Sequence, residues 1–268
     1  MHPRVSLSAI STFQWSLDED LAFYERAGIT AIGASLAKLE GAGIDAGARR
    51  LRDAGVRVTN LIGLGPFHLD DPGQWPSQRD RVRAALDAAE AVSAECMILT
   101  TGPARQLSWE DAADALESAL EPVVADARAR GLPFGLEHTN SLRVDVGFVH
   151  TLADVVDLAR RLGIGVCVET NACWAERGLA RTIAAGVDTF RVVQVSDFAI
   201  GTLSTPNRLV PGDGDIPLER ILGQILAAGY VGAFDLELIG PRIDDEGYEA
   251  ACTRAVATLG RMLEDLGA

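Results

Sequence analysis

Three glutamates stand where short apolar runs of this 268-residue chain end. Glu137 closes the run in "LPFGLEHTN", Glu169 that in "IGVCVETN" and Glu237 that in "AFDLELIG", while Gln194 lies in a fourth run, "FRVVQVSD". Unpaired carboxylates in an apolar interior are costly, and neighbouring ones repel each other. A hard divalent cation removes both costs because it prefers carboxylate and amide oxygens. The four residues therefore predict a site for Mg²⁺ or Mn²⁺.

A second interpretation of each glutamate stays open. A carboxylate at the end of a strand often pairs with an arginine in the loop after it, and for any single glutamate this is as good an account as a metal ligand. The recurrence of the same position in three neighbouring runs favours the metal site.

The elements that would position these residues form a repeating pattern. Helical segments end on a glycine directly before an apolar run at six places: Gly28, Gly55, Gly131, Gly163, Gly186 and Gly229. Glycine is the usual residue after a helix because it adopts positive φ easily. Ser93 and Ala94 take that place before "AECMILTTG", and "RVSLSAIS" opens the chain. Eight such β/α units predict one α/β domain over residues 1–268, a (β/α)8 TIM barrel with its site at the C-terminal strand ends. A doubly wound open sheet is the alternative.

Composition limits the partners. The formal net charge of −14 disfavours nucleic acid and anionic membrane surfaces. No apolar run is long enough to span a membrane, and the N-terminus lacks the apolar stretch of a signal peptide. The four scattered cysteines predict buried free thiols rather than a disulfide framework. We expect a soluble cytoplasmic protein that acts on a small molecule, with homo-oligomerisation left open.

The sequence resembles the xylose isomerase-like barrels, in particular the sugar phosphate isomerases and epimerases, over essentially its whole length. The motifs "GLEHTN", "GVCVETN", "VVQVSD", "VPGDGDIPLERIL" and "GYVGAFDLEL" carry the resemblance. It implies that Glu137, Glu169, Gln194 and Glu237 hold one divalent ion. It also implies that Glu137 and Glu237 are the catalytic acid/base pair.

The resemblance implies a metal-dependent isomerase or epimerase of a keto-sugar, polyol or related cyclic ketone, working through an enediolate. Three positions depart from the pattern: Glu169 replaces the usual aspartate, Ala172 a histidine of sugar-processing members, and Thr139 a histidine of 3-dehydroshikimate dehydratases. A metal-dependent dehydratase of the 3-dehydroshikimate or inosose type (a lyase) and a non-catalytic metabolite-binding barrel therefore stay open. A DNA-repair endonuclease on this fold is disfavoured by the net charge of −14 and only four histidines.

Further residues are candidates for contacting the substrate. Arg208, in the loop after the seventh run, is the best candidate for an anion anchor because arginine binds carboxylate and phosphate in two-pronged fashion. Lys38, the single lysine, comes after the second run and could reach the site. The other candidates are His68 in the long loop after the third run, and Asn171 and Trp174 after Glu169. His138 is expected to point away from the site because adjacent strand residues face opposite sides.

Overall fold

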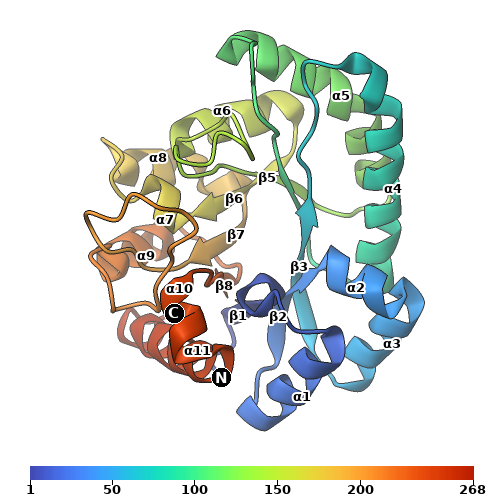
Figure 1. Ribbon diagram of the computed structural model, residues 1–268. Helices are drawn as coiled ribbons and strands as arrows, with labels where there is room; N and C mark the ends of the chain where they lie inside the picture. Colours follow the sequence, from blue (N-terminus) through green and yellow to red (C-terminus); the bar gives the residue numbers. More distant parts are fainter.

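Eight parallel strands close into a barrel in sequence order in the computed structural model, which describes residues 1–268 (Figure 1). The strands are β1 (Val5–Ser8), β2 (Ala31–Ser35), β3 (Arg57–Leu64), β4 (Met97–Thr100), β5 (Phe134–Glu137), β6 (Gly165–Glu169), β7 (Phe190–Val195) and β8 (Phe234–Leu236). Each of the eight apolar runs forms a strand, and β1 pairs with β8 to complete the ring. The predicted TIM barrel is therefore confirmed, and the open sheet is excluded.

Helices surround the barrel and bury one side against it (Figure 1). They are α1 (Leu17–Ala27), α2 (Leu36–Ala42), α3 (Ile44–Asp53), α4 (Trp75–Ala91), α5 (Trp109–Ala129), α6 (Leu152–Leu162), α7 (Thr170–Cys173), α8 (Leu179–Gly186), α9 (Leu218–Ala227), α10 (Pro241–Glu246) and α11 (Tyr248–Asp265). Short 3-10 helices are η1 (Ala9–Thr12), η2 (Pro72–Gln74) and η3 (Val187–Thr189). The termini meet, with His2 Nε2 3.1 Å from the Ala268 carbonyl oxygen.

Positive φ angles mark the helix ends that the sequence pattern predicts. Gly28, Gly55, Gly131, Gly163 and Gly229 have φ of 63°, 68°, 67°, 66° and 96°. Where glycine is missing, Ser93 itself adopts φ 52°. The prediction was wrong at Gly186, whose φ is −105°, because η3 continues the turn before β7 begins.

The inside of the barrel is only partly apolar. A small apolar cluster there consists of Cys96, Ile98, Cys167 and Val192. Asp235, by contrast, is a fully buried carboxyl that accepts from Asn60 Nδ2 at 3.2 Å. A Cβ on Gly33 would lie 2.6 Å from Asp235 Oδ2, so the glycine makes room for this carboxyl. Burial raises the pKa of Asp235 to about 7. All four cysteines are free and buried, as predicted.

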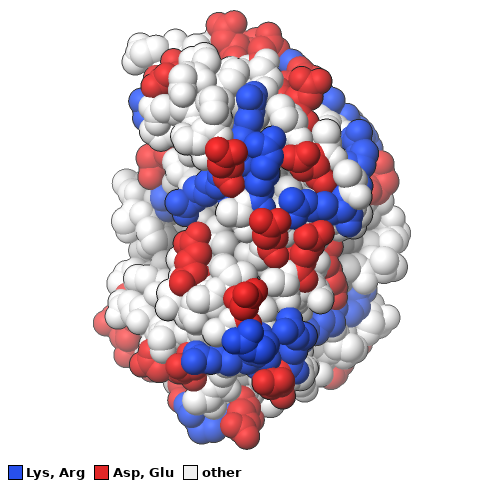
Figure 2. Space-filling view, turned by 90° about the vertical axis from the view of Figure 1, so that its right-hand side faces the viewer, with Lys and Arg blue, Asp and Glu red and all other residues white.

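Acidic and basic side chains alternate on the outer face formed around α3, α4 and α5 (Figure 2). Arg83 Nε lies 2.8 Å from Asp126, and Arg130 Nη1 lies 2.5 Å from Asp87, so these pairs join α4 to the end of α5. Exposed pairs of this kind stabilise a protein by about 0–1 kcal/mol each. No helix combines the length and apolarity that crossing a membrane requires.

A buried aspartate organises the connection between β7 and α9, which carries Arg208. The Asp197 carboxylate accepts backbone N–H groups from Phe198 at 2.9 Å, Gly212 at 2.9 Å and Ile216 at 3.0 Å. Charge-assisted bonds to backbone donors are among the stronger hydrogen bonds. Asp197 therefore fixes the path of this loop over the mouth of the barrel.

We predict that Asp197→Ala lowers the free energy of unfolding by about 3–5 kcal/mol, because it leaves buried backbone donors unpaired. Asp197→Asn retains an acceptor for Phe198 and Ile216 but not for Gly212. Its loss should be roughly half as large. Urea unfolding monitored by circular dichroism measures both variants. An Asp197→Ala protein as stable as wild type would contradict this role.

Candidate functional site

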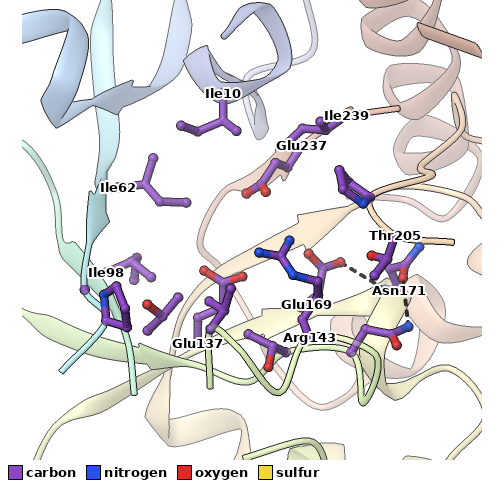
Figure 3. A pocket seen from close by; sticks show the side chains of 18 of the residues that line it. Ile10, Ile62, Ile98, Glu137, Arg143, Glu169, Asn171, Thr205, Glu237 and Ile239 are labelled. Atoms are coloured by element: carbon purple, nitrogen blue, oxygen red, sulfur yellow. Dashed lines mark hydrogen bonds between the residues drawn. The ribbon is translucent and has the colours of Figure 1, made fainter. Parts of the chain in front are cut away.

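A cavity of about 300 Å³ opens at the C-terminal mouth of the barrel. Glu137, Glu169 and Glu237 direct their carboxyl groups into it from three sides (Figure 3). Part of the remaining wall is apolar and is formed by Ile10, Ile62 and Ile98. The cavity thus combines an acidic region with an apolar one, as expected of a site for a small polar molecule with a carbon skeleton.

The strands place the glutamates as the sequence predicts. Glu137 is the last residue of β5, Glu169 is the last of β6, and Glu237 comes directly after β8. Gln194 is in register with Glu169 on β7. It is buried below the cavity rather than lining it, and its Nε2 donates to Glu237 Oε2.

His138 is a packed residue that supports the site. Its Nε2 accepts the backbone N–H of Glu169 at 3.1 Å, which ties β5 to the end of β6. Burial, with a smaller effect of His150, lowers the pKa of His138 to about 3. The ring is therefore neutral, and the expectation that it points away from the cavity agrees with its absence from the lining.

Arg208 lies between two of the glutamates. Its Nη2 is 2.6 Å from Glu169 Oε2, and its Nη1 is 2.7 Å from Glu237 Oε1. Both residues thus pair with a loop arginine, as the alternative interpretation of the sequence proposed, but the arginine comes from the β7–α9 loop and not from the loop after either glutamate's own strand. Glu137 has no such ion pair.

Burial and charge set the ionisation of the cluster. Burial, and then the carboxylates of Glu237 and Glu169, raise the pKa of Glu137 well above its usual range. Burial raises the pKa of Glu169 to about 7, although Arg208 opposes this shift. Burial alone would lower the pKa of Arg208, but Glu169 and Glu237 raise it above its usual value. The site therefore combines a permanent guanidinium cation with a carboxyl group, Glu137, whose protonated form is favoured by its surroundings.

The predicted ligand set has suitable atoms but not a suitable arrangement for a divalent cation. Its oxygens suit a hard cation, and buried Gln194 Oε1 has no hydrogen-bond donor. However, no three acidic, histidine or cysteine side chains are grouped as metal ligands. The Arg208 guanidinium contacts one carboxylate oxygen of Glu169 and one of Glu237, two members of the predicted ligand set. As arranged, these residues do not fit the ion.

Comparison with known proteins identifies the family. The sequence model of the xylose isomerase-like TIM barrel matches residues 21–256. The chain belongs to this family. A search of curated protein sequences found no match.

Solved structures share the fold of this xylose isomerase-like barrel along its whole length. Protein SMc04130 from Sinorhizobium meliloti 1021 is 25% identical, with a TM-score of 0.85 and 98% of each chain covered. The IOLI protein, solved with a bound zinc atom, is 15% identical, with a TM-score of 0.79 over 98% of this chain and 97% of that one. An L-ribulose 3-epimerase is 18% identical, with a TM-score of 0.77 over 98% and 95%.

Of the other residues predicted to contact the substrate, some line the cavity and some do not. Asn171 lines it and donates its backbone N–H to Glu169 Oε1 at 3.0 Å. Trp174 is half-buried against the hydrophobic core and does not line the cavity. His68 is also outside the lining, and its carbonyl accepts from Trp75 Nε1 at 3.0 Å. The structure thus brings Asn171 and Arg208 to the glutamates but not Trp174 or His68.

The β5–α6 connection lines the cavity with residues that were not predicted as site residues, among them an asparagine and an arginine. Asn140 and Arg143 both face the cavity. The Arg143 guanidinium pairs with Asp145 at 3.0 Å, and its charge opposes the rise in the pKa of Glu137. The available signal was the position of both residues in the loop directly after Glu137, on the face where barrel sites lie.

Lys38 belongs to a buried cluster outside the cavity lining. Its Nζ lies 2.5 Å from Asp20 Oδ2 and donates to the Thr12 carbonyl at 2.9 Å. The Asp20 side chain is fully buried, and that of Lys38 is 8% exposed. This cluster joins η1, α1 and α2, so Lys38 has a structural partner rather than free access to the substrate.

We predict that Lys38→Met lowers the free energy of unfolding by about 3–5 kcal/mol, because it leaves Asp20 buried without a cation. Lys38→Met combined with Asp20→Asn should be more stable than the single variant, since the uncompensated charge is gone. Chemical denaturation of the three proteins tests this. A Lys38→Met protein with wild-type stability would show that the ion pair has no structural role.

Proposed function

We propose that the protein is an isomerase or epimerase of a keto-sugar, polyol or related cyclic ketone. The reaction removes a proton from the carbon next to a carbonyl and then returns a proton to the enediolate. The observation that carries this proposal is that Glu137 and Glu237 face one cavity from β5 and from the end of β8. Membership of the xylose isomerase-like family and the shared fold with an L-ribulose 3-epimerase support it.

The two glutamates differ in a way that suits acid/base work. Glu237 accepts from Gln194 and pairs with Arg208, so these contacts orient an ionised carboxylate that can take the proton. Burial and neighbouring charge raise the pKa of Glu137 well above its usual range, so that side chain can supply one. An enediolate formed between them is negatively charged, and the guanidinium of Arg208 lines the same cavity.

The outcome depends on where the proton returns. Delivery to the opposite face of the same carbon gives epimerisation, and delivery to the neighbouring carbon gives isomerisation. A divalent cation, Mn²⁺ or Mg²⁺, remains a prediction from the resemblance. The zinc atom in the structure of the IOLI protein supports a cation of this class. Because Arg208 contacts two of the expected ligands, we assign the proton transfers themselves to Glu137 and Glu237.

We predict that Glu137→Gln and Glu237→Gln each lower kcat by about 100-fold or more, the usual contribution of one general acid or base. Both changes keep the size of the side chain and remove the titrating group. The assay is a panel of ketoses, inososes and dehydroshikimate in D2O, with and without added Mn²⁺. Wild-type product should carry deuterium at the carbon next to the carbonyl.

Glu176→Gln is a matched control. Glu176 is a partly buried glutamate that accepts the Leu152 backbone N–H at 2.7 Å and does not line the cavity. Its replacement should leave kcat within about threefold of wild type, because it removes no group that can reach the substrate. If both cavity variants retain full turnover on a substrate that wild type converts, the acid/base assignment is wrong.

A further inference from the structure

Arg208 is held in place by its backbone as well as by its side chain. Its N–H donates to the Ile239 carbonyl at 2.9 Å, just beyond β8. The adjacent Leu209 exchanges two backbone hydrogen bonds of 2.9 Å with Asp197, the residue that organises this loop. The side chain is only 16% exposed. The backbone of Arg208 is therefore fixed by the fold, and its side chain is largely buried, unlike that of a mobile surface arginine.

The contacts of Arg208 complete those of two carboxylates. Glu169 accepts the backbone N–H of Asn171 through Oε1 and pairs with Arg208 through Oε2. Glu237 pairs with Arg208 through Oε1 and accepts from Gln194 Nε2 through Oε2. Two of the four carboxylate oxygens thus accept a hydrogen bond, and the other two lie against the Arg208 guanidinium, although Glu169 Oε2 accepts no hydrogen bond there.

A divalent cation would need the same atoms in a different arrangement. Mg²⁺ binds oxygens at about 2.0–2.1 Å and in near-octahedral geometry, so its ligand oxygens must converge on one point. Arg208 instead holds Glu169 Oε2 and Glu237 Oε1 against its own guanidinium. It would also need Gln194 Oε1, yet that amide presents Nε2 to Glu237 and leaves Oε1 without a partner. A cation held by Glu169 Oε2, Glu237 Oε1 and Gln194 Oε1 would therefore require Arg208 to withdraw and the Gln194 amide to turn.

Charge alone does not produce this exclusion. Two carboxylates, Glu169 and Glu237, share the single guanidinium of Arg208, so this group of three keeps a negative charge and would still attract a cation. What Arg208 removes is access to specific oxygens of Glu169 and Glu237. A second arginine, Arg143, also lines the cavity but pairs with Asp145 instead. Replacing Arg143 therefore tests the effect of positive charge alone, without freeing oxygens of Glu169 or Glu237.

We propose that Arg208 and a divalent cation compete for Glu169 and Glu237, so that the arginine keeps the cation out while both of its ion pairs are formed. That this cavity is the active site rests on the proposed function. The test of the competition does not, since it measures cation binding without substrate.

The experiment is a titration of the full-length protein with Mn²⁺ alone, monitored by the electron paramagnetic resonance signal of the free ion. Wild type should bind Mn²⁺ with a dissociation constant of about 1 mM or weaker, the range of weak carboxylate sites. Arg208→Met should bind about tenfold more tightly or better, since the ligand oxygens become free. Adding Glu169→Gln to Arg208→Met should remove that gain.

Arg143→Met is the matched control, because it removes the same charge from the same cavity without freeing either carboxylate. Its Mn²⁺ affinity should stay close to that of wild type. An equal gain in Arg143→Met would overturn the proposal, because the effect would then be one of charge. So would an Arg208→Met protein that binds no better than wild type.

Wild type gives an independent test if Arg208→Met does not fold. Stoichiometric binding of Mn²⁺ by wild type in the low micromolar range, about 10 μM or tighter, overturns the proposal outright. Arg208→Lys should fold and bind more tightly than wild type, because an ammonium group cannot bridge both carboxylates. The proposed function fails on different evidence, the turnover of the Glu137 and Glu237 variants.

Discussion

Three buried carboxylates at one mouth of the barrel impose a constraint on everything around them. Glu137, Glu169 and Glu237 are each 7% exposed or less. Such groups must be neutralised by protons, by a cation or by hydrogen-bond donors. All three contribute here. Burial and acidic neighbours favour the protonated form of Glu137, Arg208 supplies positive charge, and Gln194 donates a hydrogen bond to Glu237.

The surrounding structure holds that balance in place. His138 and Asn171 fix Glu169 from its backbone and its carboxylate, through contacts of 3.1 Å and 3.0 Å. Asp197 fixes the loop that brings Arg208 over the cavity. These supporting contacts belong to strands or to loops tied to strands, so the rigidity of the barrel is transmitted to the site. Proton transfer needs this, because small displacements of an acid or base sharply reduce its efficiency.

Features with a periodic pattern can be predicted from the sequence, whereas those that depend on the path of a loop cannot. The eight strands, the capping glycines and the glutamates at strand ends obey local rules that apply to each β/α unit on its own. The pairing of Arg208 does not, because its position depends on Asp197 eleven residues earlier and on the edge of β8. Arg143 was missed for the same reason. Asp235 inside the barrel was unexpected because the polar partner that accommodates it, Asn60, comes from a strand far away in the sequence.

Two departures from the family pattern, Glu169 and Ala172, lie at the end of β6, where Glu169 also contacts Arg208. Where the resemblance would have an aspartate, Glu169 has one more methylene, and its carboxylate both accepts from Asn171 and meets Arg208. Where it would have a histidine, Ala172 offers no further ligand or charge. The longer carboxylate of Glu169, the absence of a histidine at position 172 and the guanidinium of Arg208 between two glutamates all occur in one part of the site. The positive charge closest to the Glu169 and Glu237 carboxylates is then that of Arg208, a group of the chain itself.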